Sequence, residues 1–162
     1  MSRLYIERLR VVSREYNAVQ QAVGYVIINW DAQNIDRKIK GVTPRDFRNA
    51  NTLLERTYLI RLLAEFEGIL KDHLDTNHSS ARWKGKPRTE VRDKLEVNEN
   101  ITLVVKEDSL RLAAGERQRL LDIRQYRNSI AHLNSTVPPV ITFGDALSRL
   151  NAFLAKLPEP LQ

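Results

Sequence analysis

Apolar side chains recur at intervals of three and four residues between positions 9 and 30. They are Leu9, Val12, Tyr16, Val19, Val23, Val26 and Trp30. Because an α-helix turns once in about 3.6 residues, this spacing places all of them on one face. The segment is therefore predicted to be one long amphipathic helix, whose apolar face packs either inside a helical bundle or against a partner helix.

A second long helix is predicted from Thr43-Pro44-Arg45-Asp46. This sequence combines a capping residue, a proline at the first helical position and an early acid, which together are typical of a helix start. The apolar positions that follow again repeat every three or four residues. The inner stripe consists of Leu54, Tyr58, Leu62, Phe66, Ile69 and His73, widened by Leu59, Leu63 and Leu70.

The second half of the chain is predicted to contain three more helices. A short one starts at Thr89 and runs to about Val97, a longer one covers residues 109–132, and the last is capped by Thr142 and ends before Pro158. Residues 101–105 have strand propensity, but the sequence offers no second strand to pair with them. They are interpreted as an extended apolar connection.

These segments predict an all-α fold, a single domain over residues 1–162 built as a bundle of about five helices. The chain contains no cysteine, so disulfides and thiolate metal sites are excluded. It shows neither a signal-peptide pattern nor an apolar run long enough to span a membrane, and we expect a cytoplasmic protein with no membrane partner. The net charge of +6 favours polyanionic partners such as RNA.

The helix predicted over residues 109–132 has two distinct faces. Ile123, Tyr126, Ile130 and Leu133 share a stripe that is expected to face the core. Helical geometry places the polar side chains Arg124, Arg127, Asn128 and His132 away from this stripe. An arginine and a histidine thus flank one polar face.

The hexapeptide Arg127-Asn128-Ser129-Ile130-Ala131-His132 resembles the motif of HEPN domains, in which an arginine is followed by a polar residue and, after a four-to-six-residue spacer, by a histidine. The resemblance implies a HEPN-like helical bundle with Arg127, Asn128 and His132 as catalytic residues. Many HEPN domains are metal-independent RNases, often toxins of toxin–antitoxin or phage-defence systems, and their two protomers bring the motifs together at a dimer interface. Others have no known catalysis.

Cleavage of RNA by its 2′-hydroxyl needs a base, an acid and a group that stabilises the phosphorane charge. One protomer supplies one motif histidine, whereas a homodimer supplies two, together with two copies of Arg127. We therefore predict a homodimeric endoribonuclease without cofactor or metal, with an antitoxin or other protein as a further partner. The alternative is a non-catalytic HEPN-like adaptor or regulator that binds nucleic acid or a protein.

Residues 75–88 are polar and are interpreted as a loop. Four cations surround one tryptophan there, which suits phosphate contact and base stacking. The predicted substrate-binding residues are Arg82, Trp83, Lys84, Lys86 and Arg88 of this segment, together with Arg124 of the motif helix. In the alternative interpretation the cations are merely solvated and the tryptophan packs against the bundle.

Two histidines and an acid near the end of the second helix raise a different possibility. His73, Asp75 and His78 form a conceivable set of metal ligands, although they match no recognised ligand spacing. His73 also lies on the apolar stripe, where a hydrogen-bonded core histidine is commoner. No metal site is therefore predicted.

Overall fold

The computed structural model describes residues 3–35, 39–132 and 139–158, with the backbone alone for residues 131 and 132. The described residues form a mostly helical fold. Its elements, in chain order, are α1 (Arg3–Ile28), α3 (Pro44–Asn77), the hairpin strands β1 (Arg82–Trp83) and β2 (Lys86–Pro87), α4 (Arg88–Val91), a 3-10 turn (Arg92–Lys94), α5 (Val97–Glu107), α6 (Glu116–His132) and α7 (Phe143–Leu154). The predicted all-α class is confirmed.

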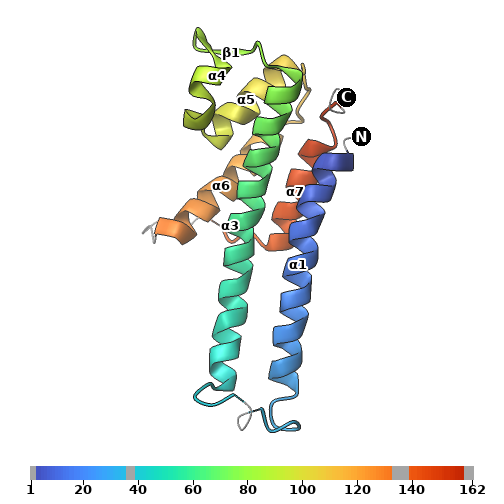
Figure 1. Ribbon diagram of the computed structural model, residues 1–162, viewed down its shortest axis with the longest axis vertical. Helices are drawn as coiled ribbons and strands as arrows, with labels where there is room; N and C mark the ends of the chain where they lie inside the picture. The colour runs from blue at the N-terminus through green and yellow to red at the C-terminus, as the bar shows by residue number, and fades with distance from the viewer. Residues whose placement is uncertain (1–2, 36–38, 133–138, 159–162) are drawn as a thin grey trace.

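The two long helices α1 and α3 run side by side along the molecule, with α7 beside α1 and with α5 and α6 against α3 (Figure 1). The core lies where these helices meet and is most tightly closed around the second half of α3. Leu62, Phe66 and Ile69 are fully buried there. Phe66 meets Phe153 of α7 edge to face, with ring centroids 5.8 Å apart.

The predicted apolar face of α1 is buried over only part of its length. Leu9, Val12 and Tyr16 belong to the core, whereas Val19 is exposed. Trp30, beyond the helix, is buried and packs edge to face on Phe47. The first half of the apolar face of α1 thus packs against other helices of the same chain.

The predicted start of α3 is confirmed. Thr43 adopts an extended conformation, its side chain accepts a hydrogen bond from the backbone of Asp46, and the Asp46 carboxylate accepts one from the backbone N–H of Thr43 at 2.8 Å. This reciprocal arrangement satisfies backbone donors that a helix start leaves unpaired. Pro44 occupies the first turn, as predicted.

The interpretation of residues 101–105 as an extended connection is wrong. These residues lie in the middle of α5, which begins after Glu96, where the Glu99 side chain accepts a hydrogen bond from the Glu96 backbone N–H at 3.1 Å. Ile101, Leu103 and Val104 are buried against the core. Burial of this apolar face outweighs the modest intrinsic preference of Ile and Val for strands.

The segment interpreted as a loop over residues 75–88 is largely ordered. The helix α3 continues to Asn77, and a short antiparallel hairpin follows, in which Arg82 pairs with Pro87 and Trp83 with Lys86. Lys84 and Gly85 turn the hairpin with positive φ angles of 48° and 82°. The short helix predicted from Thr89 to about Val97 is instead α4 followed by the 3-10 turn.

Within the part of the chain that the structure describes, no helix combines the length and hydrophobicity that crossing a membrane requires.

Candidate functional site

The core-facing stripe predicted for α6 is confirmed for its described residues. Ile123 is fully buried, Tyr126 is 8% exposed, and Ile130 packs half-buried against the core. Leu133 lies outside the described residues. Arg127 lies at the edge of this stripe and Asn128 on the opposite face, and both are half-exposed.

Arg127 is held by its neighbour in the motif. Its Nη1 atom donates a hydrogen bond to Oδ1 of Asn128 at 2.9 Å. The Nε atom of Arg127 is buried and has no hydrogen-bond partner within the described ranges, and no acid pairs with Arg127 there. The guanidinium is thus oriented by an amide and keeps its positive charge unneutralised by the described residues.

The second motif residue, His132, is the last residue of α6. Its side chain, like that of Ala131, lies outside the described part of the chain. The backbone of the whole motif therefore lies on one continuous helix. Of the three predicted catalytic side chains, the structure describes those of Arg127 and Asn128.

Arg124 lies one turn before Arg127 and is engaged by another helix. It forms an ion pair with Glu96, the residue that precedes α5, across the junction of α5 and α6. A shallow groove runs along this polar face, lined by Asn98, Gln118, Arg124, Gln125, Asn128 and Ser129. An ion pair at this exposed junction is only weakly stabilising. Arg124 can therefore leave Glu96 to contact another anion.

The hairpin presents three of its four predicted cations to solvent. Arg82 donates from Nε and Nη2 to the Gly85 carbonyl at 3.1 and 2.6 Å, and Lys86 is exposed. The ammonium of Lys84 lies 5.4 Å from the centroid of the Trp83 ring. Trp83 itself is half-buried and packs against the core, so only part of its ring is available for stacking.

Arg88 is a correction to the predicted set. It is 1% exposed, forms an ion pair with Asp75 and donates from Nη2 to the Lys71 carbonyl at 2.9 Å. A guanidinium enclosed in this way fastens the segment after the hairpin to the end of α3. It is not free to contact RNA.

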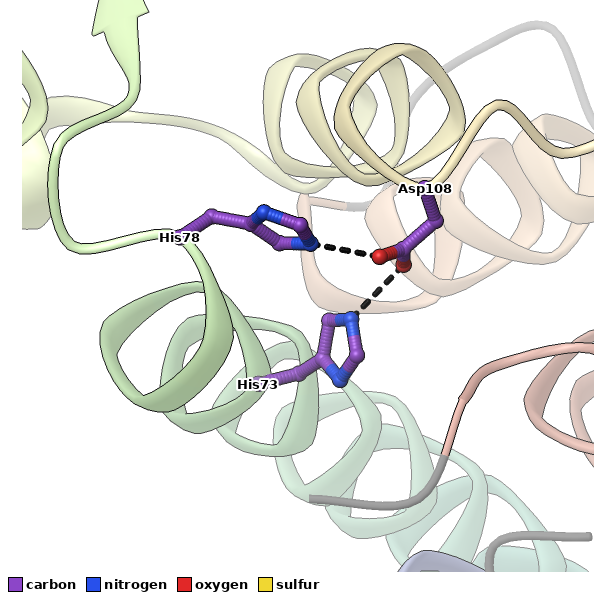
Figure 2. Close-up of side chains that lie close together, drawn as sticks. All are labelled: His73, His78 and Asp108. Atoms are coloured by element: carbon purple, nitrogen blue, oxygen red, sulfur yellow. Dashed lines mark hydrogen bonds and ion pairs between the residues drawn. The ribbon is translucent and has the colours of Figure 1, made fainter. Parts of the chain in front are cut away.

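A second polar cluster, which the sequence did not predict, lies where α3 and α5 end. Figure 2 shows the Asp108 carboxylate between the imidazole rings of His73 and His78. Nε2 of His73 is 2.7 Å from Oδ2, and Nε2 of His78 is 2.5 Å from Oδ1. Asp75, the acid that was considered beside these histidines, pairs instead with Arg88 and Arg92.

The members of this cluster are almost withdrawn from solvent. The side chains of His73, Asp108 and His78 are 0%, 3% and 20% exposed. Burial lowers the pKa of His73, although Asp108 acts in the opposite direction, so its imidazole is neutral at neutral pH. Nδ1 of the same ring faces the Tyr5 hydroxyl at 3.2 Å and the Asn77 amide nitrogen at 3.0 Å.

The sequence indicated part of this cluster, because His73 and His78 are close together in the chain. On a continuous helix, however, a separation of five residues would point their side chains about 140° apart. The pair converges because α3 stops at Asn77 and His78 takes a non-helical conformation, with φ −138° and ψ 44°. Asp108 was not predicted because the helix that ends beside it was not recognised.

Comparison of the chain with protein-family models, with curated proteins and with solved structures found no match.

Proposed function

We propose that this chain is a metal-independent endoribonuclease of the toxin or phage-defence type, which cleaves RNA at a composite site formed by Arg127, Asn128 and His132 of two protomers. The observation that carries the proposal is the state of Arg127. Its side chain is half-buried at the edge of the core stripe of α6, its Nη1 donates to Oδ1 of Asn128 at 2.9 Å, and it is paired with no acid in the described part of the chain. An arginine in this state suits the binding of a phosphate group.

In the proposed mechanism the two histidines transfer protons and the two arginines stabilise negative charge. His132 accepts the proton of the attacking 2′-hydroxyl in one protomer, and its copy in the second protomer donates a proton to the leaving 5′-oxygen. The two Arg127 side chains stabilise the charge that develops on the phosphorane. The 2′-oxygen bonds to phosphorus as the bond to the 5′-oxygen breaks, which leaves a 2′,3′-cyclic phosphate.

The surroundings of the motif favour a polyanionic substrate. The groove beside Asn128 continues past Arg124, and the chain as a whole has a net charge of +6. The exposed hairpin cations Arg82, Lys84 and Lys86, with the partly accessible ring of Trp83, add a second basic surface. Phosphate neutralisation by such cations gives affinity without sequence specificity.

The proposal is tested by incubating the purified protein with RNA in excess EDTA and identifying the product ends. We expect cleavage to persist and each 5′ fragment to end in a 2′,3′-cyclic phosphate. A matched substrate with one 2′-deoxyribose at the cut position should resist, because it lacks the nucleophile. Loss of cleavage in EDTA would contradict this mechanism. A protein that binds RNA or a protein partner through this face but never cuts RNA would be the adaptor.

A further inference from the structure

We propose that His73, His78 and Asp108 form a binding site for one divalent transition-metal ion, with Zn²⁺ as the best-fitting ion. The ligand atoms of these three side chains lie within 4.8 Å of one another. They come from the ends of two helices, as Figure 2 shows, and His78 and Asp108 are 30 residues apart in the chain. The inference does not depend on the proposed RNA cleavage, which uses other residues.

The donor set matches the chemistry of zinc. Two imidazole nitrogens and one carboxylate oxygen are among the ligands that Zn²⁺ binds in proteins, at about 2.0–2.2 Å. Tetrahedral ligands at that distance stand about 3.3 Å apart. The present Nε2 to oxygen distances of 2.7 and 2.5 Å are those of hydrogen bonds and need to lengthen by less than 1 Å. Ligand atoms that stand up to 4.8 Å apart need to approach by about 1.5 Å to reach tetrahedral spacing.

The buried carboxylate favours a cation at this place. The neighbouring acids are already neutralised, since Asp72 pairs with Arg8 and Asp75 with Arg92. Among the described residues, Asp108 faces only the two histidines and pairs with no lysine or arginine. A carboxylate that is 3% exposed is costly unless a positive charge compensates it, and a divalent ion supplies one.

Two helix ends add to this preference. His78 is the C-cap of α3, and Asp108 is the C-cap of α5. The C-terminus of a helix carries a partial negative charge from its unpaired carbonyls, which stabilises a nearby cation. The cluster thus lies where two helices both present their negative ends.

The backbone holds Asp108 in place at some cost. The residue that follows it, Ser109, has a φ angle of 51°, in the left-handed region that glycine normally occupies. Ser109 N–H bonds to the Lys106 carbonyl at 3.2 Å and Leu110 N–H to the Val105 carbonyl at 2.9 Å, which closes the end of α5. A non-glycine residue in this conformation is strained, and such strain clusters at functional sites.

The outer neighbours of His73 suit both the empty and the occupied state. A carboxylate only accepts, so Nε2 of His73 now carries the proton and Nδ1 accepts from Tyr5 or Asn77. When the metal takes Nε2, the proton moves to Nδ1, which then donates to the Tyr5 hydroxyl oxygen or to the Asn77 amide oxygen after the amide turns. Partners of this kind orient metal-bound histidines.

Three protein ligands leave one position of a tetrahedral ion open. The ring of His78 is 20% exposed, so solvent reaches the cluster and water would fill this position. Occupancy fastens the end of α3 to the end of α5. The ion therefore stabilises the half of the molecule that carries the hairpin.

The test uses the full chain without an affinity tag, stripped with EDTA and dialysed, then titrated with Zn²⁺ alone by calorimetry. We expect one ion per chain. At a hundredfold excess over the dissociation constant, the thermal midpoint should rise by about 5–10 °C. Co²⁺ should bind at the same site and give the visible absorption of a tetrahedral complex. A parent chain that binds no Zn²⁺, or whose midpoint does not move, overturns the proposal.

Variants separate this site from adventitious binding. His78→Ala and Asp108→Asn should each weaken Zn²⁺ binding by about a hundredfold or more, since even outer partners of metal ligands contribute 10–100-fold. His132→Ala is the matched control, because it removes the remaining histidine of the chain and should bind Zn²⁺ like the parent. Circular dichroism confirms that each variant is folded. Equal affinity in all three variants would assign the ion to some other surface.

Discussion

Arg88 is the residue whose role changed most between sequence and structure. It was grouped with the RNA-binding cations, but its side chain is buried between Asp75 and the Lys71 carbonyl. Removing one partner of a buried ion pair costs about 3–5 kcal/mol, because the other charge is left uncompensated. Replacement of Arg88 should therefore affect stability rather than RNA contact.

We expect Arg88→Ala to lower the free energy of unfolding by about 3 kcal/mol. Asp75 is partly exposed, which places the value at the lower end of that range. Lys86→Ala, an exposed cation two residues earlier in the chain, is the control and should change it by less than about 0.5 kcal/mol. Urea denaturation of both variants measures the difference. Equal stability of the two would show that the Arg88 ion pair contributes nothing in solution.

Which single residues could be predicted depended on whether their helix had been recognised. Ile123 and Tyr126 were assigned to the core correctly because the 3.6-residue repeat of α6 is regular. Asp108 was missed because its position depends on where α5 ends. The partners of Arg88 were missed because they depend on the packing of the hairpin against α3, which no local pattern encodes.

At the scale of the element, helices with standard caps were predicted and α5 was not. Thr43 and Thr142 each accept a hydrogen bond from the residue three positions later, as their sequences indicated. The start of α5 uses Glu96 and Glu99 instead of Ser, Thr, Asp or Asn, and its run of Ile, Leu and Val suggested an extended segment. The segment is helical because Ile101, Leu103 and Val104 are buried in the core, and a local sequence pattern does not show such packing.

The hairpin yields a prediction about RNA binding. Replacing Arg82, Lys84 and Lys86 together with Ala should weaken RNA affinity and reduce the slope of log affinity against log salt by about 2, since each phosphate contact to a single strand contributes about 0.7. Filter binding at several salt concentrations measures the slope. The charge-matched control replaces Arg45, Arg48 and Arg56, three exposed cations of α3. If both triple variants have the same slope, the hairpin is not the contact surface.

At the scale of the whole molecule, the all-α architecture followed from helical periodicity, whereas the assembly did not. The first half of the α1 face is used inside the protomer, so that face no longer argues for a partner helix along its full length. The polar face of α6 remains the surface on which the proposed composite site depends.

We expect a two-fold homodimer in solution, because one chain supplies one copy of the motif and the proposed reaction needs two. Light scattering at micromolar concentration should give twice the mass of 18.7 kDa. A monomeric mass under conditions in which the protein cleaves RNA would exclude the composite site.

The central claim, that Arg127 and His132 cut RNA, is tested most directly by the cleavage rates of single variants. Neither residue belongs to the core stripe of α6, and Arg127 is half-exposed, so Arg127→Ala and His132→Ala should stay folded and dimeric. We expect each to lose at least about 10²–10⁴ in rate. Arg127→Lys should also fail, because an ammonium does not reproduce the guanidinium fork.

The matched control is Arg119→Ala, which removes an exposed positive charge from the same helix and should cleave like the parent. The account predicts that rates fall only in the motif variants, with secondary structure and mass unchanged. Cleavage at the parental rate by folded, dimeric Arg127→Ala or His132→Ala would contradict it.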